Sequence, residues 1–299
     1  MSTENVLILG FGDIAKRLTH QLTQVSNPCR YNIRGVKRSP ATTISHEYLQ
    51  LIQGDCTDHQ RLSAILQVPA DVIVMTLTPD EMSDAGYKRS YVDTTNALLL
   101  ALREQTYQPR LLLFVSSSSV YHQSDNEWVD EHSVAQPLRY SGQRLLEAEQ
   151  LLVNSPYHHC IVRFSGIYGP GRQRLIDQVV SGNIVAKEPT LYSNRIHADD
   201  CAGVLAHLIN RQRQQPIKPL YLASDCEPVL LYTVQCWLAD QLNVAVSPPL
   251  SATIVSHASA SNTRSSKRCA NQRLLDSGYQ FQYPTFREGY TAVLKDIEQ

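Results

Sequence analysis

The stretch Val6-Leu-Ile-Leu-Gly10-Phe-Gly12-Asp-Ile-Ala15 decides the fold expected for this chain of 299 residues. Its aliphatic run predicts a buried strand that ends at Gly10. After Gly12, apolar residues recur at the spacing of one helix face, so residues 13–24 are predicted to form an amphipathic helix. A strand that turns sharply into a helix near the N-terminus is typical of a doubly wound α/β fold.

The turn itself has the glycine spacing of a phosphate-binding loop. Gly10 permits a tight turn, Gly12 lets a pyrophosphate approach the backbone, and the small Ala15 allows close packing of helix on strand. A helix N-terminus also offers unpaired N–H groups to an anion. We therefore predict a dinucleotide site, with a purely structural glycine turn as the alternative. Its predicted first contacts are Gly10, Gly12, Asp13, Ile14 and Ala15.

The end of the second predicted strand indicates which dinucleotide binds. An NAD site usually carries Asp or Glu about 20 residues after the glycines, but no acidic residue lies between Asp13 and Glu47. Arg38 suits a ribose 2′-phosphate instead, and Lys37 or Ser39 could add a contact. We therefore predict NADP, with NAD as the alternative cofactor. Solvated loop charges are the alternative interpretation of these basic residues.

Short β-branched and aliphatic runs alternate with amphipathic runs through the first half of the chain. This alternation predicts a doubly wound parallel sheet with helices on both faces. Strands are expected at 6–9, 32–36, 48–53, 72–77, 111–115 and 160–164, and helices at 60–66, 87–105 and 141–153. After Ser165 the regularity falls, although 175–180, 199–210 and 231–242 are predicted helices and 220–223 a strand. Residues 247–266, rich in Ser, Pro and Ala, are predicted to form a loop.

Two further strand ends carry polar residues. Asp55 follows the end of the third predicted strand, and Thr76 stands at the end of the fourth, where open α/β sheets bind their ligands. Both residues are therefore candidate cofactor contacts. Asp55 is expected either to reach the adenine region or to cap a helix together with Thr57 or Asp58, and both alternatives stay open.

Composition excludes several classes of protein. Apolar residues make up 42% of the chain and the formal net charge is −1, which argues against disorder and against a nucleic-acid partner. The longest apolar run, 97–102, is far shorter than the roughly 20 residues of a membrane span. No secretory signal is visible. Seven scattered cysteines lack metal-ligand spacing, so we expect reduced thiols in a cytoplasmic protein without a metal site.

Four motifs follow one another along the chain: the turn at 10–15, then 115–121, 163–172 and 195–200. In this order they resemble the short-chain dehydrogenase/reductase superfamily, and within it the extended and atypical NAD-dependent epimerase/dehydratase proteins. The spacing G-x-G-x-x-A is most similar to an atypical, YeeZ-like branch. The resemblance implies a Rossmann domain at 1–165 plus about 197–224. It also implies a smaller C-terminal α/β substrate domain at about 166–196 plus 225–299.

The resemblance also implies a catalytic Tyr, a Lys four residues later and an upstream Ser or Thr. Carried onto this chain, these positions hold Tyr140, Arg144 and Ser117. A Lys ammonium would lower the pKa of the Tyr. Arg144 keeps the positive charge but cannot lose its proton, which is a departure from the family pattern. Tyr91 stands where extended members carry an active-site Asn.

The later motifs suggest the substrate side of the site. By resemblance, Tyr168 is expected to pack at the nicotinamide end of the cofactor, and Arg172 and Arg195 to bind an anionic substrate group. Asp199 and Asp200 are expected to cap the helix that begins there. Lys267 or Arg268 could close over an anionic substrate, although a solvated loop is the simpler interpretation.

The expected function is hydride transfer by an NADP-dependent oxidoreductase or epimerase/dehydratase. Its substrate would be small and polar, for example a nucleotide-linked sugar, and the protein would be a cytoplasmic monomer or homodimer. The alternative is a non-catalytic NADP(H)-binding sensor or regulatory protein that has lost the Tyr/Lys chemistry. The residue at position 144 distinguishes the two hypotheses.

Overall fold

The computed structural model describes residues 3–24, 29–39, 48–245 and 265–297. The predicted loop at 247–266 therefore lies outside the described residues, apart from Ser265 and Ser266. The chain forms two compact units. Unit 1 contains residues 1–120, 139–163 and 202–221, and unit 2 contains 121–138, 164–201 and 222–299. The domain boundaries expected above stay a prediction, although these units place residues 121–138 with the C-terminal part of the chain.

A parallel sheet forms the centre of the fold. Among the described residues its seven strands run in the order β11-β7-β5-β4-β1-β2-β3, and the pairs on both sides of β1 are parallel. The middle of β1 is fully buried because helices cover both faces of the sheet, so Val6 lies between Ile33 and Val72. The strands are β1 (Thr3–Leu9), β2 (Arg30–Lys37), β3 (Leu49–Gln53), β4 (Val72–Met75), β5 (Leu111–Ser117), β7 (His159–Phe164) and β11 (Leu220–Ala223).

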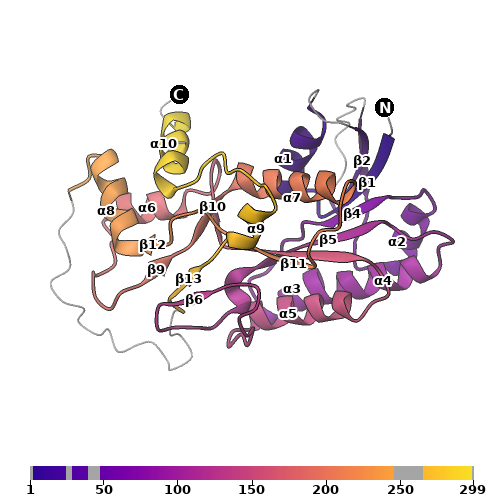
Figure 1. Ribbon diagram of the computed structural model, residues 1–299, viewed down its shortest axis with the longest axis horizontal. Coiled ribbons are helices and arrows are strands. Elements are labelled where there is room, and N and C mark those ends of the chain that lie inside the picture. The colour runs from indigo at the N-terminus through magenta and orange to yellow at the C-terminus, as the bar shows by residue number, and fades with distance from the viewer. Residues whose placement is uncertain (1–2, 25–28, 40–47, 246–264, 298–299) are drawn as a thin grey trace. The chain divides into compact units, whose positions relative to one another are not determined.

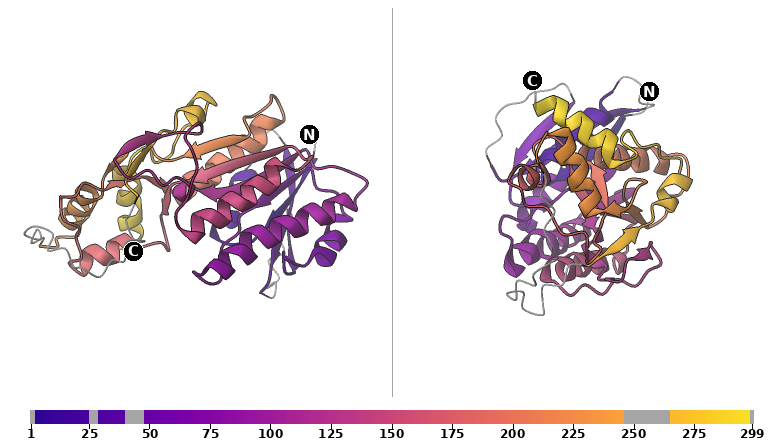
Figure 2. Two further views of the ribbon diagram at one scale, coloured as in Figure 1. Left: turned by 90° about the horizontal axis from the view of Figure 1, so that it is seen from below. Right: turned by 90° about the vertical axis from the view of Figure 1, so that its left-hand side faces the viewer.

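Helices cover the two faces of this sheet. Helices α2, α4 and α5 lie side by side on one face, and α1 and α7 lie on the other (Figure 1). The row of three helices is seen from below in the left view of Figure 2. The helices are α1 (Asp13–Leu22), α2 (His59–Leu66), α3 (Asp84–Tyr87), α4 (Thr94–Arg103), α5 (Tyr140–Val153) and α7 (Ala198–Gln212). The predicted α/β fold is confirmed.

The helix predicted at 87–105 begins earlier than expected and is not a uniform α-helix. It runs from α3 through a π-helical turn, η1 (Lys88–Asp93), into α4. In its last part Leu98, Leu99 and Leu102 are buried, whereas Leu100 is 48% exposed. The apolar excess of this helix thus mostly covers the sheet.

Unit 2 is built from short strands and helices. Its described strands form three two-stranded sheets, which pair β10 with β8, β12 with β9 and β13 with β6. These strands are β6 (Glu127–Val129), β8 (Gly166–Tyr168), β9 (Tyr192–Ser193), β10 (Arg195–His197), β12 (Val229–Leu230) and β13 (Lys267–Cys269). The helices are α6 (Arg174–Val180), α8 (Leu231–Gln241), α9 (Gln272–Asp276) and α10 (Phe286–Ile297); the 3₁₀ turn η2 (Ser118–Val120) belongs to unit 1.

Asp200 does not cap α7 as expected. Its carboxylate is fully buried and accepts hydrogen bonds from the Tyr279 hydroxyl at 2.8 Å and from the backbone N–H groups of Gln282 and Tyr283. It therefore holds the segment before α10 against the first turn of α7, and this turn belongs to unit 2.

In the part of the chain that the structure describes, every helix is too short or too polar to span a lipid bilayer.

Candidate cofactor site

A cavity of about 630 Å³ opens in unit 1 where strands β1 to β4 end. Its wall combines the glycine turn after β1, the end of β2, the segment after β3 and the segment after β4, together with part of η1 and α4. This is the edge at which open parallel sheets bind ligands. The residues that line it include Gly10, Gly12, Lys37, Arg38, Ser39, Asp55, Thr76, Asp80 and Arg89.

The glycine turn is fixed tightly at its first glycine. Gly10 has φ +86°, and a Cβ at this position would lie 2.9 Å from the backbone oxygen of Thr76. The Thr76 hydroxyl donates to the Gly10 oxygen at 2.8 Å, and the Gly10 N–H donates to the Val36 oxygen. The turn is therefore bonded to both neighbouring strands.

The second glycine leaves room for a ligand. A Cβ on Gly12 would meet no other atom within 4 Å, and Gly12 is the N-cap of α1. Open space beside the first N–H groups of a helix fits a pyrophosphate. Of the neighbouring candidates, Asp13 pairs with Arg17, while the buried side chains of Ile14 and Ala15 pack into the core. These three residues can contribute backbone groups to the ligand.

The end of β2 supplies the positive charge predicted for NADP. Lys37, Arg38 and Ser39 all line the cavity. The Arg38 guanidinium is held by both carboxylate oxygens of Asp80, which follows β4. This hydrogen bonding lowers the pKa of Asp80, so the pair is ionised at neutral pH.

Asp55 forms a second ion pair in the same cavity. Its carboxylate accepts from the Thr57 N–H at 2.9 Å, from the Thr57 hydroxyl at 2.8 Å and from Arg89 at 2.8 Å. Burial raises the pKa of Asp55, but these hydrogen bonds outweigh it and leave the pKa below its ordinary value. Asp58 caps α2 by accepting from the Arg61 N–H, so Asp55 is left to face the cavity.

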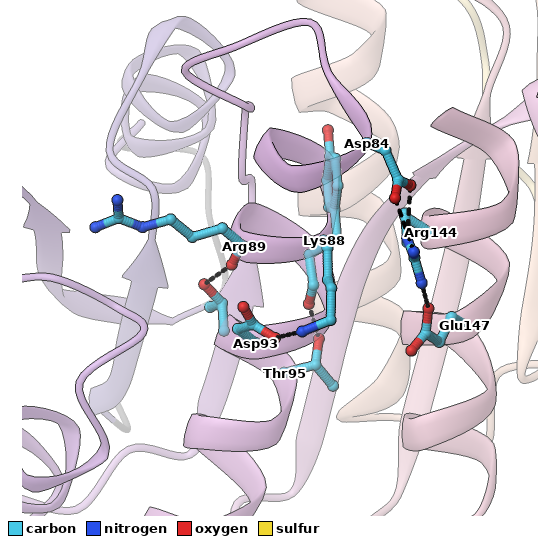
Figure 3. Close-up of polar contacts among 9 residues, drawn as sticks. Asp84, Lys88, Arg89, Asp93, Thr95, Arg144 and Glu147 are labelled. Atoms are coloured by element: carbon cyan, nitrogen blue, oxygen red, sulfur yellow. Dashed lines mark hydrogen bonds and ion pairs between the residues drawn. The ribbon is translucent and has the colours of Figure 1, made fainter. Parts of the chain in front are cut away.

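Arg89 reaches the cavity from the π-helical turn. Lys88 pairs with Asp93 at 2.8 Å, and the Thr95 hydroxyl donates to the Tyr91 oxygen at 2.7 Å (Figure 3). Figure 3 shows the Arg89 side chain pointing away from Arg144, which comes from the separate helix α5. Because π-turns often mark functional sites, Arg89 is a candidate that the sequence pattern missed. Nothing in the sequence distinguishes it from a solvated helix residue.

The predicted catalytic residues lie in unit 1 outside the cavity wall, and among the described residues no hydrogen bond joins Ser117, Tyr140 and Arg144 to one another. Arg144 donates to both oxygens of Asp84 at 2.8 and 2.9 Å and to Glu147 at 2.7 Å (Figure 3). The Tyr140 hydroxyl donates to the Met82 oxygen at 2.5 Å. The Ser117 hydroxyl accepts from the Ser119 N–H, which closes the turn after β5.

An aromatic row accompanies Tyr140. Its ring lies edge-on to Tyr87, which contacts Tyr91, which in turn lies edge-on to Phe114 of β5. Tyr91, at the position of the family's Asn, is buried and donates to the Leu77 oxygen at 3.3 Å. Burial raises the pKa of Tyr91, so it is no base at neutral pH.

The remaining predicted residues belong to unit 2. Tyr168 is 2% exposed and stacks on Tyr290 at 4.4 Å, so it is part of the unit 2 core and not of the cavity wall in unit 1. Arg195 donates to the Tyr290 hydroxyl at 3.2 Å. Arg172 is exposed in the turn after β8.

Lys267 and Arg268 are also structured. The buried Lys267 ammonium donates to the Tyr121 oxygen and to the Ser265 hydroxyl, and the Arg268 guanidinium lies over the rings of Trp128 and Tyr192. The solvated loop suggested by their sequence context is therefore wrong for both residues, because β13 pairs with β6.

All seven cysteines lie in the described ranges, and none of them forms a disulfide bond. Burial raises the pKa of Cys56, which lines the cavity, to about 11. Cys56 is therefore an unreactive thiol at neutral pH. Among the described residues, no group of three His, Cys, Asp or Glu side chains could hold a metal ion.

Comparison with known proteins places the chain in a family. The model of the NAD-dependent epimerase/dehydratase family matches residues 6–222. A structure from Methylobacillus flagellatus that is assigned to NAD-dependent epimerase/dehydratases is 32% identical, with a TM-score of 0.80 and 99% of each chain covered. No curated protein matches the sequence.

More distant structures share the fold. UDP-glucuronic acid 4-epimerase from Bacillus cereus, in complex with UDP-glucuronic acid and NAD, is 19% identical, with a TM-score of 0.77 and 99% of each chain covered. The human epimerase family protein SDR39U1 with NADPH is 16% identical with a TM-score of 0.72, covering 97% of this chain and 99% of its own. The match over residues 6–222 and the 32% identical structure show that this chain belongs to the NAD-dependent epimerase/dehydratase family.

Proposed function

We propose that the protein is an NADP-dependent oxidoreductase or epimerase/dehydratase that acts by hydride transfer on a small polar substrate. The observation that carries the cofactor choice is the end of β2, where Lys37, Arg38 and Ser39 line the cavity. Arg38 offers a planar pair of donors to a 2′-phosphate. The open space over Gly12 would receive the pyrophosphate. The bound nicotinamide would supply the hydride chemistry.

A titration tests this choice of cofactor. The purified protein is titrated with NADPH and with NADH, and the cofactor fluorescence is followed for the wild type and for Arg38→Ala. We expect the wild type to bind NADPH more tightly and the variant to lose on the order of tenfold or more in NADPH affinity, with little change for NADH. Arg103→Ala, at the exposed last turn of α4, is the matched control. Equal binding of both cofactors by the wild type would overturn the NADP assignment.

For catalysis, Tyr140 is proposed as the acid/base and Ser117 as the group that orients the substrate oxygen, with Arg144 as electrostatic support. The hydroxyl of Tyr140 would have to leave the Met82 oxygen to reach a substrate. Mutation to Phe removes only that hydroxyl. A turnover that is abolished in Tyr140→Phe while NADPH binding is kept would support this role.

One observation favours a second function, a non-catalytic NADP(H)-binding sensor or regulator. The donors of Arg144 are engaged by Asp84 and Glu147, and Arg144 replaces the family's Lys. The sensor hypothesis is supported if the wild type shows no turnover on a broad panel of nucleotide-linked sugars and Arg144→Lys shows measurable turnover on that panel. If Arg144→Lys shows no turnover either, the Arg at position 144 is not what prevents catalysis. This result would argue against a sensor that arose by loss of the Lys.

Arg172 and Arg195, both of unit 2, are proposed to bind an anionic group of the substrate, such as a diphosphate. The nucleotide-sugar complex of the Bacillus cereus epimerase supports this substrate class. We further propose that the protein is a cytoplasmic monomer or homodimer, in line with its free thiols.

A further inference from the structure

We propose that Asp80 is a specificity-determining residue: its carboxylate competes with the 2′-phosphate of the cofactor for Arg38 and so restrains the preference for NADP. This inference rests on the proposed NADP site. It concerns a residue after β4, which lies 42 positions from Arg38 in the sequence.

The geometry of the pair carries the inference. Both carboxylate oxygens of Asp80 bond to the two terminal nitrogens of Arg38, so the guanidinium presents to Asp80 the same fork that a phosphate would use. Both side chains are about half exposed and both residues line the cavity. A phosphate that binds the Arg38 guanidinium through this fork must therefore take these donors from Asp80.

The surrounding charges strengthen the competition. The cavity wall carries a second ion pair, Asp55 with Arg89, so its two arginines are matched by two carboxylates. Lys37 adds one further cation. When Arg38 turns to a phosphate, the released Asp80 carboxylate is left as a like charge beside an anion of charge near −2. Repulsion of this kind acts on a phosphate and not on a ribose hydroxyl.

No such penalty is expected for NAD. A carboxylate accepts hydrogen bonds from hydroxyl groups, so Asp80 can remain on Arg38 and still face an unphosphorylated ribose. Asp80 therefore penalises the phosphorylated cofactor selectively. Asp80→Asn keeps the shape of the side chain and removes this penalty.

The experiment measures binding alone. Adenosine 2′,5′-bisphosphate and adenosine 5′-monophosphate are titrated by calorimetry, and NADPH and NADH by fluorescence, at low and at high salt. We expect Asp80→Asn to tighten the two 2′-phosphorylated ligands by roughly tenfold at low salt and to leave the other two within about twofold. The gain should shrink at high salt because the interaction is exposed.

A matched control and a third variant separate the possible failures. Glu81→Gln removes the neighbouring exposed charge outside the cavity wall and should change no affinity. If Arg38→Ala weakens NADPH binding but Asp80→Asn does not tighten it, the competition is refuted and the NADP site stands. If Arg38→Ala has no effect on NADPH either, the proposed NADP site fails, and the role of Asp80 fails with it. An equal gain in Glu81→Gln would show a general charge effect and would also refute the inference.

Discussion

Two glycines in one turn have different physical tasks. Gly10 adopts φ +86° and has no space for a side chain, because a Cβ would approach the Thr76 oxygen to 2.9 Å. Gly12 has an extended conformation with φ −100°, and the space around its Cα is open. The first glycine therefore serves the fold, and the second serves the ligand.

Alanine substitutions should separate these tasks. Gly10→Ala should lower the free energy of unfolding by about 1–3 kcal/mol, because the residue is strained and meets the next strand. Gly12→Ala should leave the unfolding midpoint almost unchanged but weaken NADPH binding by on the order of tenfold or more, because its methyl group occupies the space proposed for the pyrophosphate. Urea unfolding and fluorescence titration of both variants check this. Equal loss of stability in the two variants would contradict it.

At the scale of elements, a buried ion pair joins α5 to the sheet. Glu149 of α5 and Arg163 of β7 have side chains only 3% and 7% exposed and are joined by hydrogen bonds of 3.0 and 2.5 Å. Ser116, next to the candidate Ser117, donates to the same carboxylate at 2.5 Å. These contacts fix the helix that begins at Tyr140 against the strand that ends at Ser117.

Removing the charge of Glu149 should destabilise the protein. In Glu149→Gln the Arg163 guanidinium stays buried without its counter-ion, and we expect the free energy of unfolding to fall by about 3 kcal/mol. Glu147→Gln, two residues earlier on the same helix, removes a partly exposed partner of Arg144 and should leave the unfolding midpoint nearly unchanged. Urea unfolding of both variants checks this. If the two variants lose comparable free energy of unfolding, the burial of the Glu149–Arg163 pair is not the reason for the loss.

The elements of unit 1 could be predicted because their signals are local. The strand 220–223 was predicted with the bounds of β11, and the Gly10–Ala15 turn lies where its spacing places it. The strands of unit 2 are two or three residues long, too short for a hydrophobic period to show. Ion pairs such as Arg38 with Asp80 join segments far apart in the chain, so no local pattern indicates them.

The distant contacts that escape prediction also decide how the candidate site is charged. The basic end of β2, which the sequence predicts to contact the cofactor, lines the cavity. No local pattern predicts that Asp80 neutralises Arg38 there. Arg144 likewise was predicted beside Tyr140, and its bonds to Asp84 depend on a residue 60 positions away. The residue type can therefore suggest a role. Which of its hydrogen-bond donors are already occupied depends on the carboxylates that the fold brings beside it.

At the scale of the whole molecule, unit 2 contains a buried carboxyl that links stability to pH. Asp225 is 1% exposed, and its Oδ2 has no hydrogen-bond partner among the described residues. Burial raises its pKa to about 8, against the opposing effects of a hydrogen bond from the Glu227 N–H and of the Arg195 charge. Glu227 and Asp200 are the other charged groups that act on it, both by disfavouring the carboxylate.

The raised pKa fixes the sign of the pH dependence. Between the pKa of an unfolded Asp, about 3.9, and that of folded Asp225, the folded state holds one more proton than the unfolded state. The contribution of this group to stability is therefore complete below about pH 4 and is lost as the pH rises towards 8, at up to about 1.4 kcal/mol per pH unit. Asp225→Asn has no such proton, so it should gain stability relative to the wild type over this range.

Hydrogen exchange in the backbone of unit 2, measured between pH 5 and pH 9 with correction for the intrinsic rates, checks this expectation, since the two units can open separately. The difference in opening free energy between Asp225→Asn and the wild type should rise with pH and level off near pH 8. Asp240→Asn, on the exposed face of α8, should follow the wild type throughout. Parallel profiles for Asp225→Asn and the wild type would mean that Asp225 is ionised in the folded protein, with Arg195 compensating its burial.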